Sequence, residues 1–179
     1  MPLDKPLEQI TEADLTQLMT TGESESRTLD YKRTVHEDQW EFRADVTAMA
    51  NTAGGHLILG VDEQGGIPVA IPGLPPDPDP DKVKLRLQQI LGANVEPRLP
   101  PVDMHHVWLD NGNWCLVVKV PHSWAQPHAV VKGESRKFHA RHSSGKFVMD
   151  VGQLRVAFSL SANVEERIRD FRIQRLNLL

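Results

Sequence analysis

Two short acidic segments of the chain could hold a divalent cation. Glu25 and Asp30 are five residues apart, and Lys32 follows two residues later. Beyond an apolar run, Asp62 and Glu63 are adjacent. Converging carboxylates repel one another unless a cation compensates them, and a metal there could polarise a phosphate oxygen and activate a water molecule. Lys32 would then stabilise negative charge on that phosphate. The alternative is that these are solvated acids of loops and turns.

A second group of residues is basic and suits anion binding. Between residues 131 and 147 the cations outnumber the single acid, Glu134, and they are Lys132, Arg136, Lys137, Arg141 and Lys146. Phosphate contacts by such side chains give an affinity that depends strongly on salt and carries little sequence information. Arg27 is a further candidate for the same nucleic-acid contact. The alternative is an ordinary solvated hairpin, because runs of charge are usually solvent-facing.

The aromatic residues allow a third interaction. Tryptophan rings can stack on bases, although on hairpins and helices they more often pack against neighbouring side chains. The candidates are Trp40, Trp108, Trp114 and Trp124.

Composition limits the classes of protein to consider. The chain has 179 residues, a net charge of -4 and 40% hydrophobic residues, which indicates one ordinary globular domain. Its one cysteine, Cys115, excludes an internal disulfide and a four-cysteine zinc site. The N-terminus has no secretory pattern, and no apolar run approaches the ~18 residues of a membrane span. We therefore expect a protein that does not enter a membrane and is located in the cytoplasm.

Periodicity predicts the elements that hold the acidic segments. Thr11 with Asp14 begins a leading helix that ends near Gly22, so residues 1–22 form a leading helical segment. A strand is expected over 29–35. Apolar side chains at helical spacing then predict a helix that ends at a pair of glycines, and a buried strand follows over 56–61.

The second half of the chain predicts a helix, two hairpins and further helices. Residues 65–81 hold six prolines and are expected to form a loop, followed by a helix from about 83 to 91. Asn111-Gly112 joins strands 104–109 and 114–120, and a second hairpin is expected over 129–141. Asp150 begins a helix, and Asn163 begins a last one. The predicted class is α/β (α+β), a mixed sheet with two hairpins, flanked by helices.

Several of these segments together resemble the Schlafen AlbA-2 domain family. The family pattern is a Glu-Ser-x-x-x-Glu-Phe-Lys segment, then Ala-x-Ala-Asn-Thr-x-Gly-Gly, then Gly-Val-Asp-Asp-x-Gly. The matching residues are Glu25, Ser26, Asp30, Tyr31, Lys32, Ala48, Ala50, Asn51, Thr52, Gly54, Gly55, Gly60, Val61, Asp62, Glu63 and Gly65. A looser match continues through Phe138 to Gly145, similar to an aromatic-x-x-Arg-x-x-Ser segment.

The resemblance implies a nucleic-acid-binding domain over residues 23–160. The residues after it predict a C-terminal helix over 161–179, and because this helix has no stop signal, we expect it to link to a further domain or to pair with a partner chain. The animal Schlafen proteins include metal-dependent endoribonucleases that act on structured RNA such as tRNA, so the resemblance implies the same activity for this chain. The catalytic and metal-binding acids carried over are Glu25, Asp30 and Glu63, with Mg²⁺ or Mn²⁺ as cofactor, and Lys32 faces the phosphate. ATP binding has no support in the sequence, because a Gly-x-x-x-x-Gly-Lys-Ser/Thr loop is absent.

Two alternatives stay open. One is a non-catalytic DNA- or RNA-binding regulatory domain, of the kind found in transcriptional regulators, which would use the basic residues and leave the acids idle. The other is a domain for protein assembly through the last helix. The animal Schlafen core resembles two lobes around a positively charged valley, and this chain is long enough for one lobe. We therefore expect a homodimer.

Overall fold

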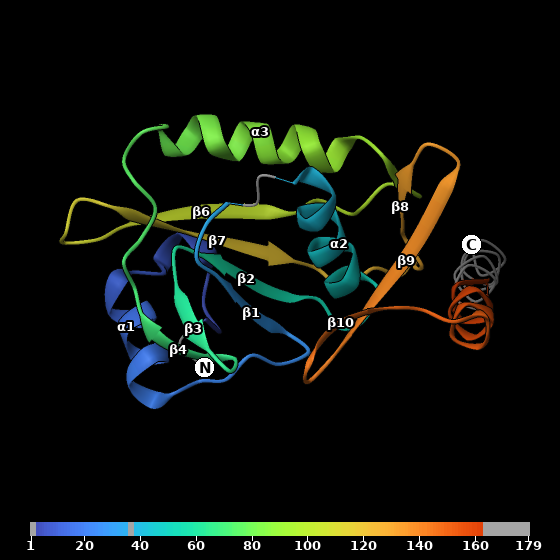
Figure 1. Ribbon diagram of the computed structural model, residues 1–179, viewed down its shortest axis with the longest axis horizontal. Helices are drawn as coiled ribbons and strands as arrows, with labels where there is room; N and C mark the ends of the chain where they lie inside the picture. Colours follow the sequence, from blue (N-terminus) through green and yellow to red (C-terminus); the bar gives the residue numbers. More distant parts are fainter. Residues whose placement is uncertain (1–2, 36–37, 163–179) are drawn as a thin grey trace, which may run out of the picture.

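The computed structural model describes residues 3–35 and 38–162, and Figure 1 shows how their elements are arranged. A 3-10 turn, Leu7–Gln9, precedes helix α1, Glu12–Thr21. Thr11 and Asp14 form the predicted capping box, and Gly22 closes the helix with a left-handed backbone at φ 62°. The leading helix predicted from the sequence is confirmed.

A four-stranded mixed sheet forms the centre of the fold. Its order is β1 (Leu29–Lys32), β2 (Gly55–Leu59), β7 (Trp114–Val120) and β6 (Asp103–Trp108). β1 and β2 run parallel, whereas β2–β7 and β7–β6 are antiparallel. The α+β class and the hairpin joined by Asn111-Gly112 are confirmed.

Both faces of this sheet are buried. Helices α2 (Gln39–Ala50) and α3 (Pro80–Gly92) cover one face, and the N-terminal turn with α1 covers the other. The alternation along β2 divides its side chains between the two cores: Leu57 and Leu59 belong to the first, and Ile58 belongs to the second. A strand buried on both faces is nearly continuous in apolar residues, as this one is.

A second, antiparallel sheet packs on α2. Its order is β10 (Gly145–Val148), β9 (Ser135–His142), β8 (Ala129–Lys132) and β5 (Val95–Glu96). β9 crosses close to α2 and extends past it at both ends (Figure 1). The β8–β9 hairpin confirms the prediction, while β10 adds a third antiparallel strand that the sequence analysis did not separate.

A small hairpin replaces part of the expected proline-rich loop. β3 (Asp62–Gln64) and β4 (Ile67–Ala70) pair antiparallel around Gly65 and Gly66, whose φ angles are 63° and 80°. Two glycines with positive φ match a tight two-residue hairpin turn. Pro68 is tolerated because proline can occupy an edge strand. The prediction of an irregular segment over 65–81 was therefore wrong at its start.

The end of the described chain is a helix over 151–162. Asp150 and Gln153 cap it reciprocally, because the amide of each donates to the side chain of the other at 2.9 and 2.8 Å. The helix predicted to begin at Asn163 lies outside the described residues. Within residues 3–35 and 38–162, no helix is both long and apolar enough to cross a membrane.

Candidate functional site

Asp30 lies at the centre of the first group of predicted site residues. It is on β1 with its side chain 2% exposed, and Oδ1 contacts two cations, Arg141 at 2.9 Å and Lys32 at 3.0 Å. Arg141 reaches it from β9 and also donates from Nε to the carbonyl of Ser26 at 3.0 Å. A buried carboxylate requires such partners, because desolvation of an unpaired charge is costly.

Glu25 lies beside Asp30, where the two carboxyl groups can share a proton. Its Oε1 accepts the amide of Tyr31 at 3.0 Å. Burial and the neighbouring Asp30 carboxylate raise the pKa of Glu25 from 4.5 to about 7. Asp30 Oδ2 is buried, and the described residues offer it no amide, hydroxyl or ammonium donor, so the protonated Glu25 carboxyl is its natural donor.

The charges around Asp30 fix which carboxyl keeps the proton. Burial alone would raise the pKa of Asp30, but its hydrogen bonds with Glu25 and Arg141 and the charges of Lys32 and Arg141 outweigh burial and lower that pKa. Asp30 therefore carries the negative charge and Glu25 the shared proton. From the sequence, both carboxylates were expected to be ionised metal ligands.

Glu63 and Asp62 lie on β3 and have partners of their own. Glu63 Oε2 accepts the amide of Gly66 at 2.6 Å and so stabilises the β3–β4 turn. The carbonyl of Gly66 in turn accepts the amide of Glu25 at 2.7 Å, which joins this turn to the Asp30 region through the backbone. Asp62 forms an exposed ion pair with Arg33 at 2.9 Å.

The three acids do not fit a magnesium ion in this arrangement. Magnesium needs oxygen ligands in near-ideal octahedral geometry, but Asp30 Oδ1 is already paired with two cations and Glu63 Oε2 with an amide. Within the described part of the chain, no group of three His, Cys, Asp or Glu side chains is placed to hold a metal. The metal site therefore stays a prediction that this geometry does not support.

Two of the six predicted basic contacts point into the protein. Arg141 is 4% exposed and is held by Asp30 and backbone carbonyls, so its guanidinium does not reach the surface. Lys146 on β10 binds Asp45 and Glu41 of α2. Burial would lower the pKa of Lys146, but these two carboxylates outweigh burial and raise it. Both cations therefore join the second sheet to other elements by ion pairs, Arg141 to β1 and Lys146 to α2.

The exposed cations gather on the β8–β9 hairpin. Lys132, Arg136 and Lys137 are all exposed. Arg136 pairs with Glu96 at 3.1 Å across the sheet, and both side chains are about half exposed. Such a pair contributes little to stability and gives way easily to another anion. The ammonium groups of Lys132 and Lys137 lie 5.9 and 5.8 Å from the ring centroid of Trp40, at the start of α2.

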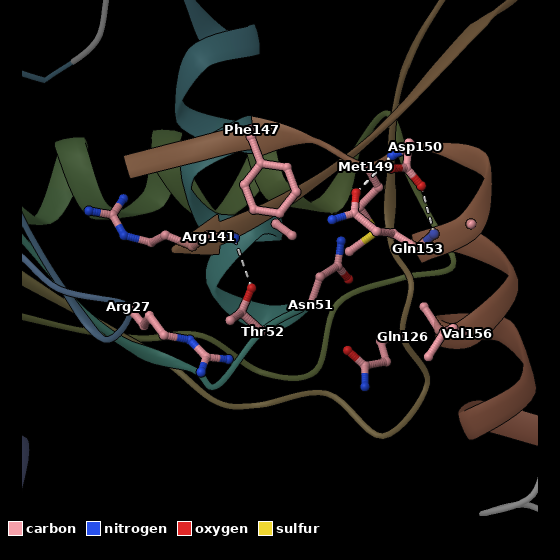
Figure 2. A pocket seen from close by; sticks show the side chains of 13 residues that line it. Arg27, Asn51, Thr52, Gln126, Arg141, Phe147, Met149, Asp150, Gln153 and Val156 are labelled. Atoms are coloured by element: carbon pink, nitrogen blue, oxygen red, sulfur yellow. Dashed lines mark hydrogen bonds between the residues drawn. The ribbon is translucent and has the colours of Figure 1, made fainter. Parts of the chain in front are cut away.

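Arg27 is exposed and lies at a different place, on the loop between α1 and β1. It lines a cavity of about 590 Å³ with Gln126, Phe147, Gln153 and Val156, between the second sheet and the helix over 151–162 (Figure 2). The structure therefore separates Arg27 from the hairpin cations that the sequence analysis grouped with it.

Asn51, part of the Ala-Asn-Thr segment, joins the end of α2 to the second sheet. Its Nδ2 donates to the carbonyls of His128 and His139, both at 2.9 Å, and its Oδ1 accepts the amide of His128 at 2.7 Å. Thr52 Oγ1 accepts the amide of Arg141 at 2.9 Å. This segment therefore positions β8 and β9, a role that its place at a helix end did not reveal.

Comparisons with known proteins agree with these motifs. The family model described as Schlafen, AlbA_2 matches residues 25–150. None of the curated proteins matches the chain.

Two solved structures are similar in part. The N-terminal domain of a Nitrosomonas europaea protein related to the ATP-dependent DNA helicase RecG is 32% identical, over 60% of this chain and 72% of that one, with a TM-score of 0.46. A Corynebacterium diphtheriae protein, DIP2311, is 17% identical, over 77% of this chain and 26% of that one, with a TM-score of 0.47.

Proposed function

The chain belongs to the Schlafen AlbA_2 family, which suggests a nucleic-acid-related domain, and we propose that it binds a phosphate backbone through the β8–β9 hairpin. The observation that carries the proposal is the cluster of exposed cations on that hairpin, Lys132, Arg136 and Lys137. The chain as a whole is acidic, with a net charge of -4, so this local excess of positive charge is not the general character of the surface.

The hairpin suits phosphate binding because its cations are exposed and their present contacts are weak. Lys132 and Lys137 make cation–π contacts with the Trp40 ring, and Arg136 makes an ion pair with the exposed carboxylate of Glu96. Replacing these contacts by phosphate contacts costs little and releases counterions from the nucleic acid, which makes the affinity depend strongly on salt. The binding is therefore expected to tolerate many sequences.

In this function Asp30 and Glu25 have a structural role and do not catalyse cleavage. Asp30 and Glu25 form a proton-sharing pair that is compensated by Arg141 and Lys32, and this arrangement supports a structural role. Metal-dependent RNA cleavage would need these groups to release their partners. The experiment below therefore includes metal.

The test is incubation of the purified protein with labelled tRNA and with labelled single-stranded DNA, in Mg²⁺, Mn²⁺ or EDTA, followed by gels that show both retardation and cleavage. We expect retardation in all three conditions, weaker at higher salt, with intact nucleic acid. Metal-dependent cleavage that Asp30→Asn abolishes would overturn the non-catalytic role. Absence of retardation by either nucleic acid at low salt would overturn the binding proposal.

A further inference from the structure

The cavity beside Trp40 has the composition of a nucleobase site. Its volume is about 420 Å³, and it lies between the first turn of α2, the β8–β9 hairpin and residue 94. Its lining includes the side chains of Gln39, Trp40, Asn94 and Lys132. Asp38 and Arg43 line it as well, but the Asp38 carboxylate caps the amide of Trp40 at 2.8 Å and Arg43 donates to backbone carbonyls at 2.9 Å. This size is within the range of pockets that hold small molecules.

Each wall of this cavity offers a different interaction. The half-buried Trp40 supplies an aromatic surface, and two lysines lie within 6 Å of its ring centroid. Gln39 Oε1 accepts from Arg43 at 3.3 Å, so the Gln39 amide offers a base its donor side, while the Asn94 amide can both donate to and accept from the edge of a base. Aromatic stacking next to cations that follow the backbone is how single strands are bound.

The position of Asn94 is fixed by the backbone. It has a φ of 59°, a left-handed conformation that is uncommon for residues other than glycine, and its carbonyl accepts the amide of Val131 at 2.9 Å. This bond ties residue 94 to the start of the hairpin that carries Lys132. The backbone at residue 94 is therefore held beside the backbone of the hairpin.

We infer that this cavity takes an unpaired base, and that the nucleic acid bound by the hairpin is single-stranded at this point. The inference rests on the proposed function, because it needs the phosphates of the same strand to lie along Lys132 and Lys137. A duplex keeps its bases paired and stacked, so it can meet the lysines but cannot place a base against Trp40. Single-stranded loops and tails can do both.

The test compares single strands with duplexes on tryptophan variants. Labelled 12-nucleotide RNA and DNA, each as a single strand and as a duplex, are titrated with the full chain in EDTA by fluorescence anisotropy. Trp40→Leu is expected to weaken single-strand binding about 5- to 150-fold, as removal of one stacked aromatic does. It is expected to change duplex binding less than 3-fold. Trp40→Phe, which keeps a ring, is expected to restore most of the single-strand affinity.

Trp108→Leu is the matched control, because this tryptophan is 51% exposed and lies on β6, outside the cavity. It is expected to change neither affinity. Trp40 also packs edge-on against His139, so Trp40→Leu can lower stability. For that case the wild-type protein supplies a second measurement: single strands quench its tryptophan fluorescence, and Trp40→Phe removes that quenching.

The outcomes separate this inference from the proposed function. If Trp40→Leu weakens single strands and duplexes equally, or weakens neither, the base site is refuted while hairpin binding can stand. If single strands bind without quenching that depends on Trp40, the base site is refuted as well. If the wild type binds neither form at low salt, the proposed function fails and this inference fails with it.

Discussion

The buried pair of Asp30 and Arg141 gives the strongest stability prediction. Arg141→Met keeps most of the side-chain volume but removes the ion pair, in which the two side chains are 3% and 2% exposed. Breaking a buried pair costs about 3 to 5 kcal/mol, because the remaining charge stays buried without compensation. Lys32 still contacts Asp30 at 3.0 Å, so we expect a loss of about 3 kcal/mol, at the low end of this range.

Arg136→Met is the matched control on the same strand. Arg136 also pairs with a carboxylate, Glu96, at 3.1 Å, but these side chains are 52% and 59% exposed. Exposed pairs contribute about 0 to 1 kcal/mol, so this change should cost less than about 1 kcal/mol. The free energy of unfolding is measured for both variants by urea denaturation, followed by circular dichroism at pH 7.

Nucleic-acid affinity should rank the same two variants in the opposite order. Arg136→Met removes an exposed cation of the hairpin and should weaken binding, whereas folded Arg141→Met should bind like the wild type. The reasoning is refuted if Arg141→Met is destabilised no more than Arg136→Met. It is also refuted if the folded Arg141→Met protein loses more affinity than Arg136→Met does.

Three further predictions concern Glu25, Asn51 and the oligomeric state. The pKa of Glu25 is raised from 4.5 to about 7, so the folded state binds more protons than the unfolded state between these pH values. The free energy of unfolding should therefore fall as the pH rises from 4.5 to about 7. Glu25→Gln, which keeps a donor for Asp30, should reduce this pH dependence when urea denaturation is compared at pH 5 and pH 8. Asn51→Ala removes three buried hydrogen bonds and should cost about 3 kcal/mol by the same method. A loss under about 1 kcal/mol would contradict its role in joining α2 to the second sheet. The expected homodimer should scatter light as about twice 20.1 kDa at tens of micromolar, and a monomer there would refute it.

The sequence predicted the elements whose signals are local. The capping box at Thr11, the Asn111-Gly112 turn and the cap at Asp150 are each formed within a few residues, and each is confirmed. The β3–β4 hairpin was missed because its strands are short and one contains Pro68, which normally indicates a loop. The hydrogen bond from the amide of Gly66 to Glu63 Oε2, which stabilises the turn of this hairpin, was missed with it.

The direction of the basic side chains could not be predicted from local signals. Lys137 and Arg141 lie on the same face of β9, because side chains alternate along a strand. Lys137 lies by the start of α2 and contacts the Trp40 ring, whereas Arg141 lies beside β1 and is covered. The difference depends on where α2 and β1 cross the strand, which is a property of the tertiary structure.

The measurement that tests the central claim most directly is the salt dependence of single-strand binding in EDTA, for the wild type and for the Lys132→Gln/Lys137→Gln variant. If both lysines contact phosphates, the variant should bind more weakly, and its slope of log affinity against log salt should be smaller by about 1.4, since each single-strand phosphate contact contributes about 0.7. An unchanged slope and affinity would contradict binding through the β8–β9 hairpin.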